Sequence, residues 1–188
     1  MGKVSTEIDP ALARFIERQR VFFVATAPRR GGHVNLSPKG LDTLRILDGR
    51  SVAYLDLTGS GVETIAHLRD DSRIVIMFCA FEGPPKIVRL HGRGDPVEPS
   101  DPEFAGLRAL FPAYDGVRSI IRVHLERVSD SCGFGVPELR YVRERPQLRA
   151  WVDRKGEAGL RRYRAEHNSE SIDGLPGLAV RATEEGER

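Results

Sequence analysis

Residues 21–37 read VFFVATAPRRGGHVNLS, and this stretch decides the fold. Residues 21–26 are rich in β-branched and aromatic side chains, and residues 33–37 alternate between polar and apolar side chains. Both patterns are typical of β-strands. The Arg-Arg-Gly-Gly sequence at 29–32 lies between them and supplies turn residues. The stretch therefore predicts a β-hairpin.

Further strands are expected downstream of this hairpin. Apolar alternation or β-branched composition marks residues 43–47, 51–57, 73–81, 87–91 and 119–128. Short turns join most of the strands, and strands and helices do not alternate as they do in a parallel α/β fold. The pattern predicts a mainly β fold with peripheral helices (α+β), in the form of an antiparallel barrel or sandwich.

Four helices are expected around these strands. Two of them begin with Asp-Pro, in which the carboxylate can cap the helix and proline suits the first helical position. The expected helices cover residues 10–20, 62–68, 103–111 and 145–168, the last with an interruption at Lys155-Gly156.

We expect residues 1–188 to form a single domain. Its barrel core covers about 20–137, and a helical segment with a docked tail covers about 145–177. Ile172 and Leu175 are apolar anchors for the tail, which is otherwise rich in Gly, Pro and Ser. Residues 184–188 are expected to be disordered.

The composition argues against several classes of protein. Lys and Arg total 29 and Asp and Glu total 27, so the net charge of +2 gives no reason to expect nucleic-acid binding. The longest apolar run, residues 74–81, is far too short to span a membrane. Two cysteines cannot form a disulfide framework, and they predict a reduced, cytoplasmic protein.

The strongest local signal for a ligand is the turn from Thr58 to Thr64. It is rich in glycine and hydroxyl groups, leaves a strand and opens a helix. Backbone N–H groups and the positive end of the helix dipole would meet there, which suits a phosphate. The alternative is an ordinary helix start, with Ser60 as the cap and Glu63 completing a capping box.

A second candidate is the strand end from Asn35 to Gly40. The chain has only four lysines against 25 arginines, and Lys39 is one of them. Beside Ser37, its ammonium group could act as a point charge for a phosphate. The alternative is a solvated lysine in a turn.

The third candidate is the glycine-rich loop at 131–137, where the backbone could approach a flat ligand closely. Cys132 lies in it, with no histidine nearby in sequence, and is expected to be structural or a contact. The five histidines have no metal-ligand spacing, so no metal site is expected.

These motifs and several others occur in a recognisable order, at residues 25–27, 34–40, 54–56, 58–68, 87–92 and 131–137. Together they resemble the pyridoxamine 5′-phosphate oxidase-related, FMN-binding split-barrel superfamily over roughly residues 10–177. The resemblance implies a six-stranded antiparallel split barrel. It also implies a homodimer with one FMN in each of two clefts at the subunit interface, and a flavin-dependent oxidoreductase with a small-molecule substrate that is not identified.

The three sequence clusters and the resemblance together predict a set of cofactor-binding residues, and no catalytic side chain is assigned. The set is Asn35, Ser37, Lys39, Gly40, Thr58, Gly59, Ser60, Gly61, Glu63, Thr64, Ser131 and Gly133.

The chain departs from the family pattern in the phosphate turn, where relatives carry Ser/Thr-Arg-Lys and this chain has no cation. Either Arg73 or Arg89 then supplies the charge, or the cofactor is not FMN. Ile87 stands where a glutamine often contacts the flavin ring. The C-terminal Arg-Leu-x-x-Arg motif is not evident, so oxidation of vitamin B6 is not expected. The alternatives are a deazaflavin-dependent reductase and a non-catalytic haem or tetrapyrrole carrier that uses His67 or His91.

Overall fold

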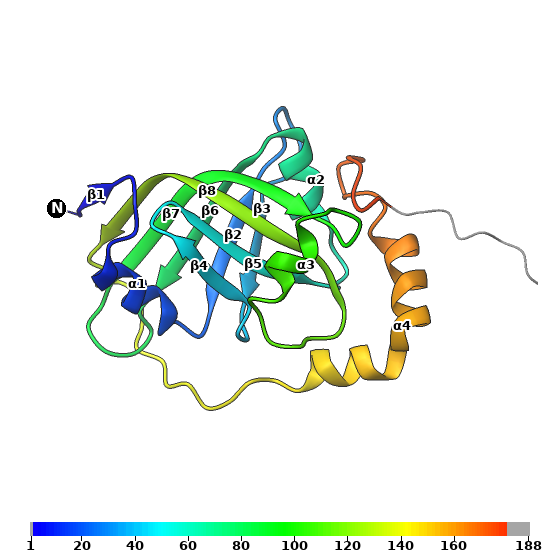
Figure 1. Cartoon of the computed structure of the whole chain (residues 1–188). Coiled ribbons are helices and arrows are strands. Elements are labelled where there is room, and N and C mark those ends of the chain that lie inside the picture. The colour runs from blue at the N-terminus through cyan, green and yellow to red at the C-terminus, as the bar shows by residue number, and fades with distance from the viewer. Residues whose placement is uncertain (1, 180–188) are drawn as a thin grey trace, which may run out of the picture.

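The computed structural model describes residues 2–179, and its strands form one antiparallel sheet that curls into a barrel (Figure 1). The strands are β1 (Val4–Ser5), β2 (Phe22–Thr26), β3 (Asn35–Lys39), β4 (Leu44–Asp48), β5 (Ser51–Leu57), β6 (Arg73–Cys79), β7 (Ile87–Val97) and β8 (Val117–Ser131). The helices are α1 (Pro10–Glu17), α2 (Glu63–Asp70), α3 (Phe104–Arg108) and α4 (Gln147–His167).

The predicted fold is confirmed, with eight strands in place of six. The sheet order is β3-β2-β6-β7-β8-β5-β4, and β1 pairs with β8 as well. All seven strands expected from the pattern are present, and the eighth, β1, has only two residues. A two-residue strand carries no periodicity, so no pattern in the sequence could reveal it. The end at 184–188 lies outside the described residues.

All four expected helices form as well. Asp9 caps α1 by accepting a hydrogen bond from the Leu12 N–H, as the Asp-Pro start predicts. The expected interruption in α4 is at Gly156, whose φ of 61° and ψ of 175° are not helical. None of the helices within residues 2–179 combines the length and the apolar composition needed to cross a membrane.

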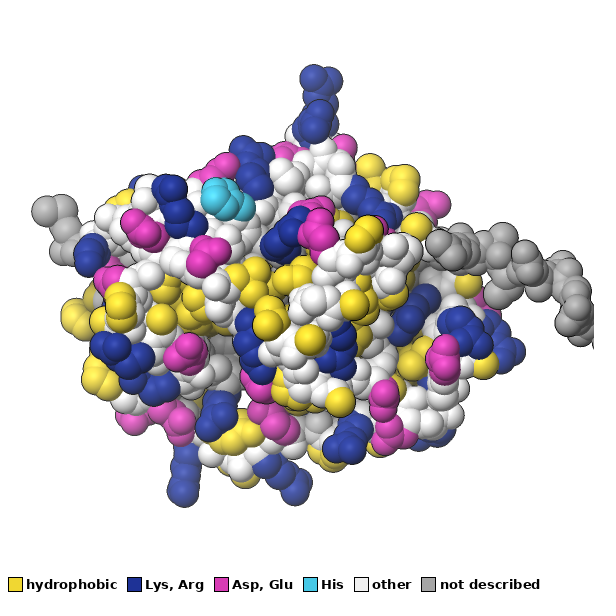
Figure 2. Space-filling view, in the orientation of Figure 1, with side chains coloured by type: hydrophobic (Ala, Val, Ile, Leu, Met, Phe, Trp, Pro, Cys, Tyr) yellow, Lys and Arg dark blue, Asp and Glu magenta, His cyan; other side chains and the backbone are white. Residues whose placement is uncertain are grey.

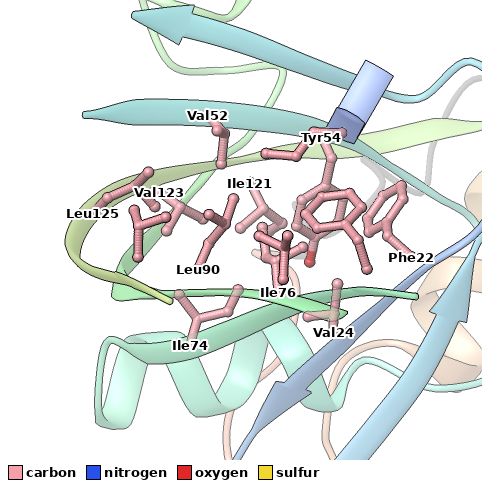
Figure 3. Packing of buried hydrophobic residues seen from close by; sticks show 14 of the residues in the cluster. Phe22, Val24, Val52, Tyr54, Ile74, Ile76, Leu90, Ile121, Val123 and Leu125 are labelled. Carbon is pink, nitrogen blue, oxygen red and sulfur yellow. The ribbon is translucent and has the colours of Figure 1, made fainter. Parts of the chain in front are cut away.

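The core fills the barrel with side chains that alternate along each strand. In Figure 3, Val24, Ile76, Leu90 and Ile121 point toward one another, and all four are fully buried. A smaller apolar cluster lies on the outer side of β5, where Leu55 and Ile120 pack with Phe111. Residues 52–56 of β5 are consequently buried on both faces.

The outer face of β3, β2 and β6 carries apolar side chains. Cross-strand register forms two rows on this face. The rows are Leu36-Ala25-Val75-His91 and Pro38-Phe23-Met77-Arg89. Leu36 is 63 % exposed. We call these two rows the outer sheet face.

Candidate functional site

Asp56 is the centre of the candidate site. Its side chain is 0 % exposed at the end of β5, and an isolated charge there would be costly. Lys39 Nζ lies 3.2 Å from Asp56 Oδ1, and Arg118 Nε donates to Oδ2 at 2.7 Å. Burial by itself raises the pKa of Asp56, but the charges of Arg118 and Lys39 outweigh it and hold the pKa below its ordinary value. The carboxylate is therefore ionised and holds two cations in place.

Two arginines reach the hydroxyl-rich turn that follows β5. Arg118 Nη1 donates to Asn168 Oδ1 at 2.9 Å and lies 3.4 Å from the Gly59 carbonyl oxygen. Arg164, from α4, donates through Nε to Thr58 Oγ1 at 2.8 Å. Burial first, and then the charges of Arg118 and Arg161, lower the pKa of Arg164. An anion bound at this turn would relieve that repulsion.

The first turn of α2 has no side-chain cap. Its N-cap residue is Val62, which cannot supply an oxygen, and no side chain bonds to the cap position. The capping alternative, with Ser60 as the cap, is therefore wrong. The Glu63 side chain turns back toward Gly61, so close that a Cβ on Gly61 would collide with it. The start of α2 therefore presents free backbone N–H groups and the positive end of the helix dipole, which favour an anion. The Glu63 carboxylate beside it opposes one.

Asn35 is held by a buried polar network. Its amide donates to Thr26 Oγ1 at 3.1 Å and to Thr64 Oγ1 at 3.0 Å, and its own oxygen accepts from Ser37 at 2.9 Å. Thr26 Oγ1 also bonds to His67 Nδ1 at 3.1 Å. Because Asn35 accepts the Ser37 hydroxyl hydrogen, the Ser37 oxygen is oriented as an acceptor for a ligand donor.

Two buried polar atoms flank this network without a protein partner, Tyr54 OH and His67 Nε2. His67 Nε2 is 4.0 Å from Asp173 Oδ2, too far for a hydrogen bond. The other Asp173 oxygen bonds to His33 Nδ1 at 2.7 Å. Such unpaired atoms are uncommon in proteins and are typical of functional regions.

The C-terminal tail docks beside the site. The Asn168 amide, 0 % exposed, donates to the Gly59 carbonyl oxygen at 3.0 Å. Asp173 accepts from the His33 backbone N–H at 2.8 Å, which attaches the tail to the β2–β3 turn. Leu175 is half-buried, but Ile172 is 71 % exposed, so the predicted anchor at Ile172 is wrong.

The structure gathers most of the predicted cofactor-binding residues at one end of the barrel. These are Asn35, Ser37, Lys39, Thr58, Gly59, Ser60, Gly61, Glu63 and Thr64. Gly40 continues from Lys39 and accepts a hydrogen bond from Thr43 Oγ1 at 2.7 Å.

Ser131 and Gly133 lie elsewhere. The Gly116 carbonyl oxygen, next to the start of β8, accepts a hydrogen bond from Thr58 Oγ1. Ser131 is the last residue of the same 15-residue strand. At about 3.3 Å per residue, roughly 40 Å of strand separates the two ends. Ser131 instead accepts from Arg89 Nη1 at 3.2 Å.

Within one chain, the expected sources of positive charge do not lie at the turn. Arg73 pairs with Asp71 at 2.6 Å, and Arg89 lies beside Ser131, so neither reaches the turn. Arg118 and Arg164 take that place. Nothing in the sequence distinguished these two among 25 arginines, because their role depends on the pairing of β8 with β5 and on the path of α4.

The two histidines of the tetrapyrrole alternative differ in accessibility. His67 is 0 % exposed, so in this conformation its ring is not accessible to a haem iron, although Nε2 has no partner. His91 is half-buried on β7, and burial, followed by the charges of Arg127 and Arg89, lowers its pKa. It lines a cavity of about 350 Å³ together with Arg73 and Arg93.

Known proteins resemble this chain in sequence and in structure. The family model described as pyridoxamine 5′-phosphate oxidase matches residues 8–132. The pyridoxamine 5′-phosphate oxidase family protein ustO of Aspergillus flavus is 41 % identical over 189 residues, which cover 90 % of this chain and 75 % of that protein.

Two solved structures share the fold. HupZ of Group A Streptococcus has a TM-score of 0.51 at 21 % identity, covering 64 % of this chain and 91 % of that one. A proposed pyridoxamine 5′-phosphate oxidase from Lactobacillus delbrueckii has a TM-score of 0.52 at 16 % identity, covering 66 % and 94 %. With the family model covering more than half of the sequence, this chain belongs to the pyridoxamine 5′-phosphate oxidase family.

Proposed function

We propose that this protein binds a flavin, FMN, and is an oxidoreductase that acts on a small organic molecule. When bound, the flavin ring supplies the hydride chemistry. The side chains of this chain have two tasks, to hold the phosphate and to orient the ring. Membership of the family supports the proposal, and the geometry of the turn from Thr58 to Thr64 carries it.

The carrying observation is the convergence of three cations near that turn. Lys39 and Arg118 are held by Asp56, and Arg164 is bonded to Thr58. The uncapped first turn of α2 adds backbone N–H groups. Hydroxyls, amides and guanidinium groups are the donors that phosphate oxygens accept from. The residues present therefore fit a phosphorylated cofactor, although the local Arg-Lys pair of relatives is missing.

We also propose a homodimer with the cofactor at its interface. Ser131 and Gly133 are at the opposite end of β8 from the phosphate turn, so in one chain they do not share a ligand with it. Two copies could combine the two ends. We assign the Leu36-Ala25-Val75 row of the outer sheet face to the partner copy, because these three side chains are apolar and Leu36 is 63 % exposed. The free thiols of Cys79 and Cys132 favour a cytoplasmic location.

The test compares FMN with riboflavin, which is the same flavin without the phosphate. Absorption and fluorescence titrations of the purified chain give both dissociation constants. We expect FMN to bind at least about tenfold more tightly than riboflavin, because one charge-assisted hydrogen bond contributes about that much to the affinity. Arg164→Gln should remove most of that preference, and Arg162→Gln, at an exposed arginine on the same helix, should keep it.

Equal affinity for FMN and riboflavin would sink the phosphate assignment. A chain that binds neither flavin sinks the proposed function altogether. A deazaflavin titrated in parallel distinguishes the reductase alternative. A haem Soret band that disappears in His91→Ala would favour the tetrapyrrole carrier, since His91 lines the smaller cavity.

A further inference from the structure

A large cavity, lined in part by Lys39, lies between the barrel and the segment that leads to α4. Its volume is about 1390 Å³, above the ~300–1,000 Å³ of common small-molecule pockets. One wall is the barrel end, formed by α1, the end of β3 and the β6–β7 turn, and the other wall is the segment from Leu139 to Leu148. In Figure 1 the chain between β8 and α4 runs along the lower side of the barrel.

The segment is attached to the barrel chiefly through Tyr141. The Tyr141 N–H donates to Glu82 Oε1 at 3.0 Å, and the Arg20 guanidinium lies 5.1 Å from the centre of its ring. Leu139 N–H donates to the Phe81 carbonyl oxygen at 2.8 Å. These contacts hold the two walls apart at one side and leave the cavity between them.

The cavity lining is strongly basic. On the barrel wall the cations are Arg18, Arg20, Lys39 and Lys86, and on the segment they are Arg140, Arg143 and Arg145. Only three carboxylates face them, and two of these, Glu82 and Glu144, are engaged by Tyr141. The lining thus has four more cations than anions, whereas the whole chain has a net charge of +2.

Several of these cations have no anionic partner. Within residues 2–179, the side chains of Arg18, Arg140, Arg143 and Arg145 make no ion pair and no hydrogen bond. Figure 2 shows Lys and Arg side chains along the lower edge of the molecule, where the segment runs. A cluster of like charges that no carboxylate neutralises raises the local concentration of anions.

The floor of the cavity is apolar. Phe15, Phe23 and Phe81 line it, and Phe15 is only 8 % exposed. A ligand that matches both features has an anionic group for the arginines and an apolar or aromatic body for the phenylalanines.

We infer that this cavity binds an organic acid with an apolar or aromatic body, and that this acid is the substrate. Lys39 supports the assignment of this acid as the substrate, because Lys39 lines the cavity and its Nζ is bonded to Asp56 beside the turn from Thr58 to Thr64. Lys39 therefore belongs both to the cavity lining and to the candidate cofactor site. The proposal that the cavity binds an organic acid rests on the cavity alone. The proposal that this acid is the substrate rests on the proposed flavin function.

The experiment uses a pair of ligands that differ only in charge, naphthoate and naphthamide. Each competes with anilinonaphthalene sulfonate, an anionic dye that fluoresces in apolar surroundings, on the full chain without cofactor. We expect naphthoate to displace the dye at a concentration about tenfold lower than naphthamide, with a difference that shrinks at high salt.

Variants locate the binding. Arg143→Gln with Arg145→Gln should weaken naphthoate roughly fivefold, because exposed charge contacts are individually modest, and should leave naphthamide unchanged. Arg154→Gln with Arg162→Gln removes two exposed arginines of α4 that do not line the cavity and should change neither ligand. Equal competition by both ligands, or a cavity variant that binds naphthoate like the unmodified chain, overturns the site.

A second readout separates the site from its assignment. Naphthoate added to the FMN-loaded protein should shift the visible absorption band of the flavin, and the cavity variant should require more naphthoate for the same shift. Naphthoate that binds without any spectral change overturns the substrate assignment. A chain that binds naphthoate but no FMN keeps the anion site and contradicts the proposed function.

Discussion

Asp56 shows how one residue organises the site. It follows Tyr54 on the barrel-facing side of β5, where an apolar residue would be expected. Its carboxylate accepts from Arg118 and Lys39 and fixes both cations next to the hydroxyl-rich turn. Buried ion pairs are weak evidence for stability, but they are effective at holding groups in one geometry.

Asp56→Asn should destabilise the protein by about 3 kcal/mol, because Arg118, 5 % exposed, loses its buried partner. The pKa of Asp56 is lowered in the folded state, so its stabilisation is present above the ordinary carboxyl pKa near 4. It is lost as the pH falls through the lowered value. Denaturant unfolding should therefore show a difference between variant and unmodified chain at pH 7 that shrinks below about pH 4.

The exposed pair of Asp42 and Arg45 provides the control for this measurement. Asp42 has a 60 % exposed side chain, so Asp42→Asn should cost less than about 1 kcal/mol. If Asp56→Asn costs no more than this control, the role assigned to Asp56 is wrong.

Glu63 is the residue that works against a phosphate at the start of α2. Glu63→Gln removes its carboxylate, so FMN should bind several-fold more tightly, with little change for riboflavin. Both dissociation constants are measured by flavin fluorescence quenching. Glu166→Gln, exposed on α4, should change neither. An identical response of both flavins to Glu63→Gln would mean that the phosphate binds elsewhere.

At the scale of elements, the β2–β3 turn and the C-terminal tail hold each other. Gly32 has a φ of +70°, and a Cβ on it would lie 2.6 Å from Asp173 Oδ2. Gly31 has a similar φ of +63° but open space around it. The two glycines thus share the backbone requirement, but only a Cβ at Gly32 would meet the tail, at Asp173, and also Pro28 Cγ at 2.8 Å.

Gly32→Ala should release the tail, and Gly31→Ala should not. Both variants carry the strain of a left-handed backbone, of about 1–2 kcal/mol. Only Gly32→Ala pushes Asp173 away, so amide hydrogen exchange of residues 168–179 should be faster in that variant alone. Equal exchange in the two variants would show that the turn does not hold the tail.

At the scale of the whole molecule, the outer sheet face determines assembly under the proposed dimer. Leu36→Lys places a charge at the exposed end of an apolar row, on the edge strand β3, and should convert a dimer to a monomer in sedimentation experiments. Flavin affinity should fall with it, because the cofactor site is shared. Leu110→Lys, at a 48 % exposed leucine outside this face, is the control. A Leu36→Lys protein of unchanged mass that binds flavin normally contradicts the shared site.

The strands and helices could be predicted because their signals are local. Residues 21–37 carry alternation and turn chemistry within one hairpin, and the Asp-Pro starts carry their own caps. The turn from Thr58 to Thr64 could also be singled out as a candidate site, since its glycines and hydroxyls are consecutive. Its cations could not be singled out, because Arg118 is 62 residues from Asp56 and Arg164 is 106 residues from Thr58. The cavity could not be predicted either, because its walls come from segments that are far apart in the sequence.

The sequence by itself determined the barrel, the order of its elements and the family, because periodicity, turn residues and ordered motifs are properties of neighbours along the chain. Only the tertiary structure decided which charges meet. The antiparallel pairing of β5 with β8 brings Arg118 to Asp56, and the path of α4 brings Arg164 to Thr58. Electrostatic energy depends on distance through space, and one arginine among 25 acquires a role only when the fold gives it a partner.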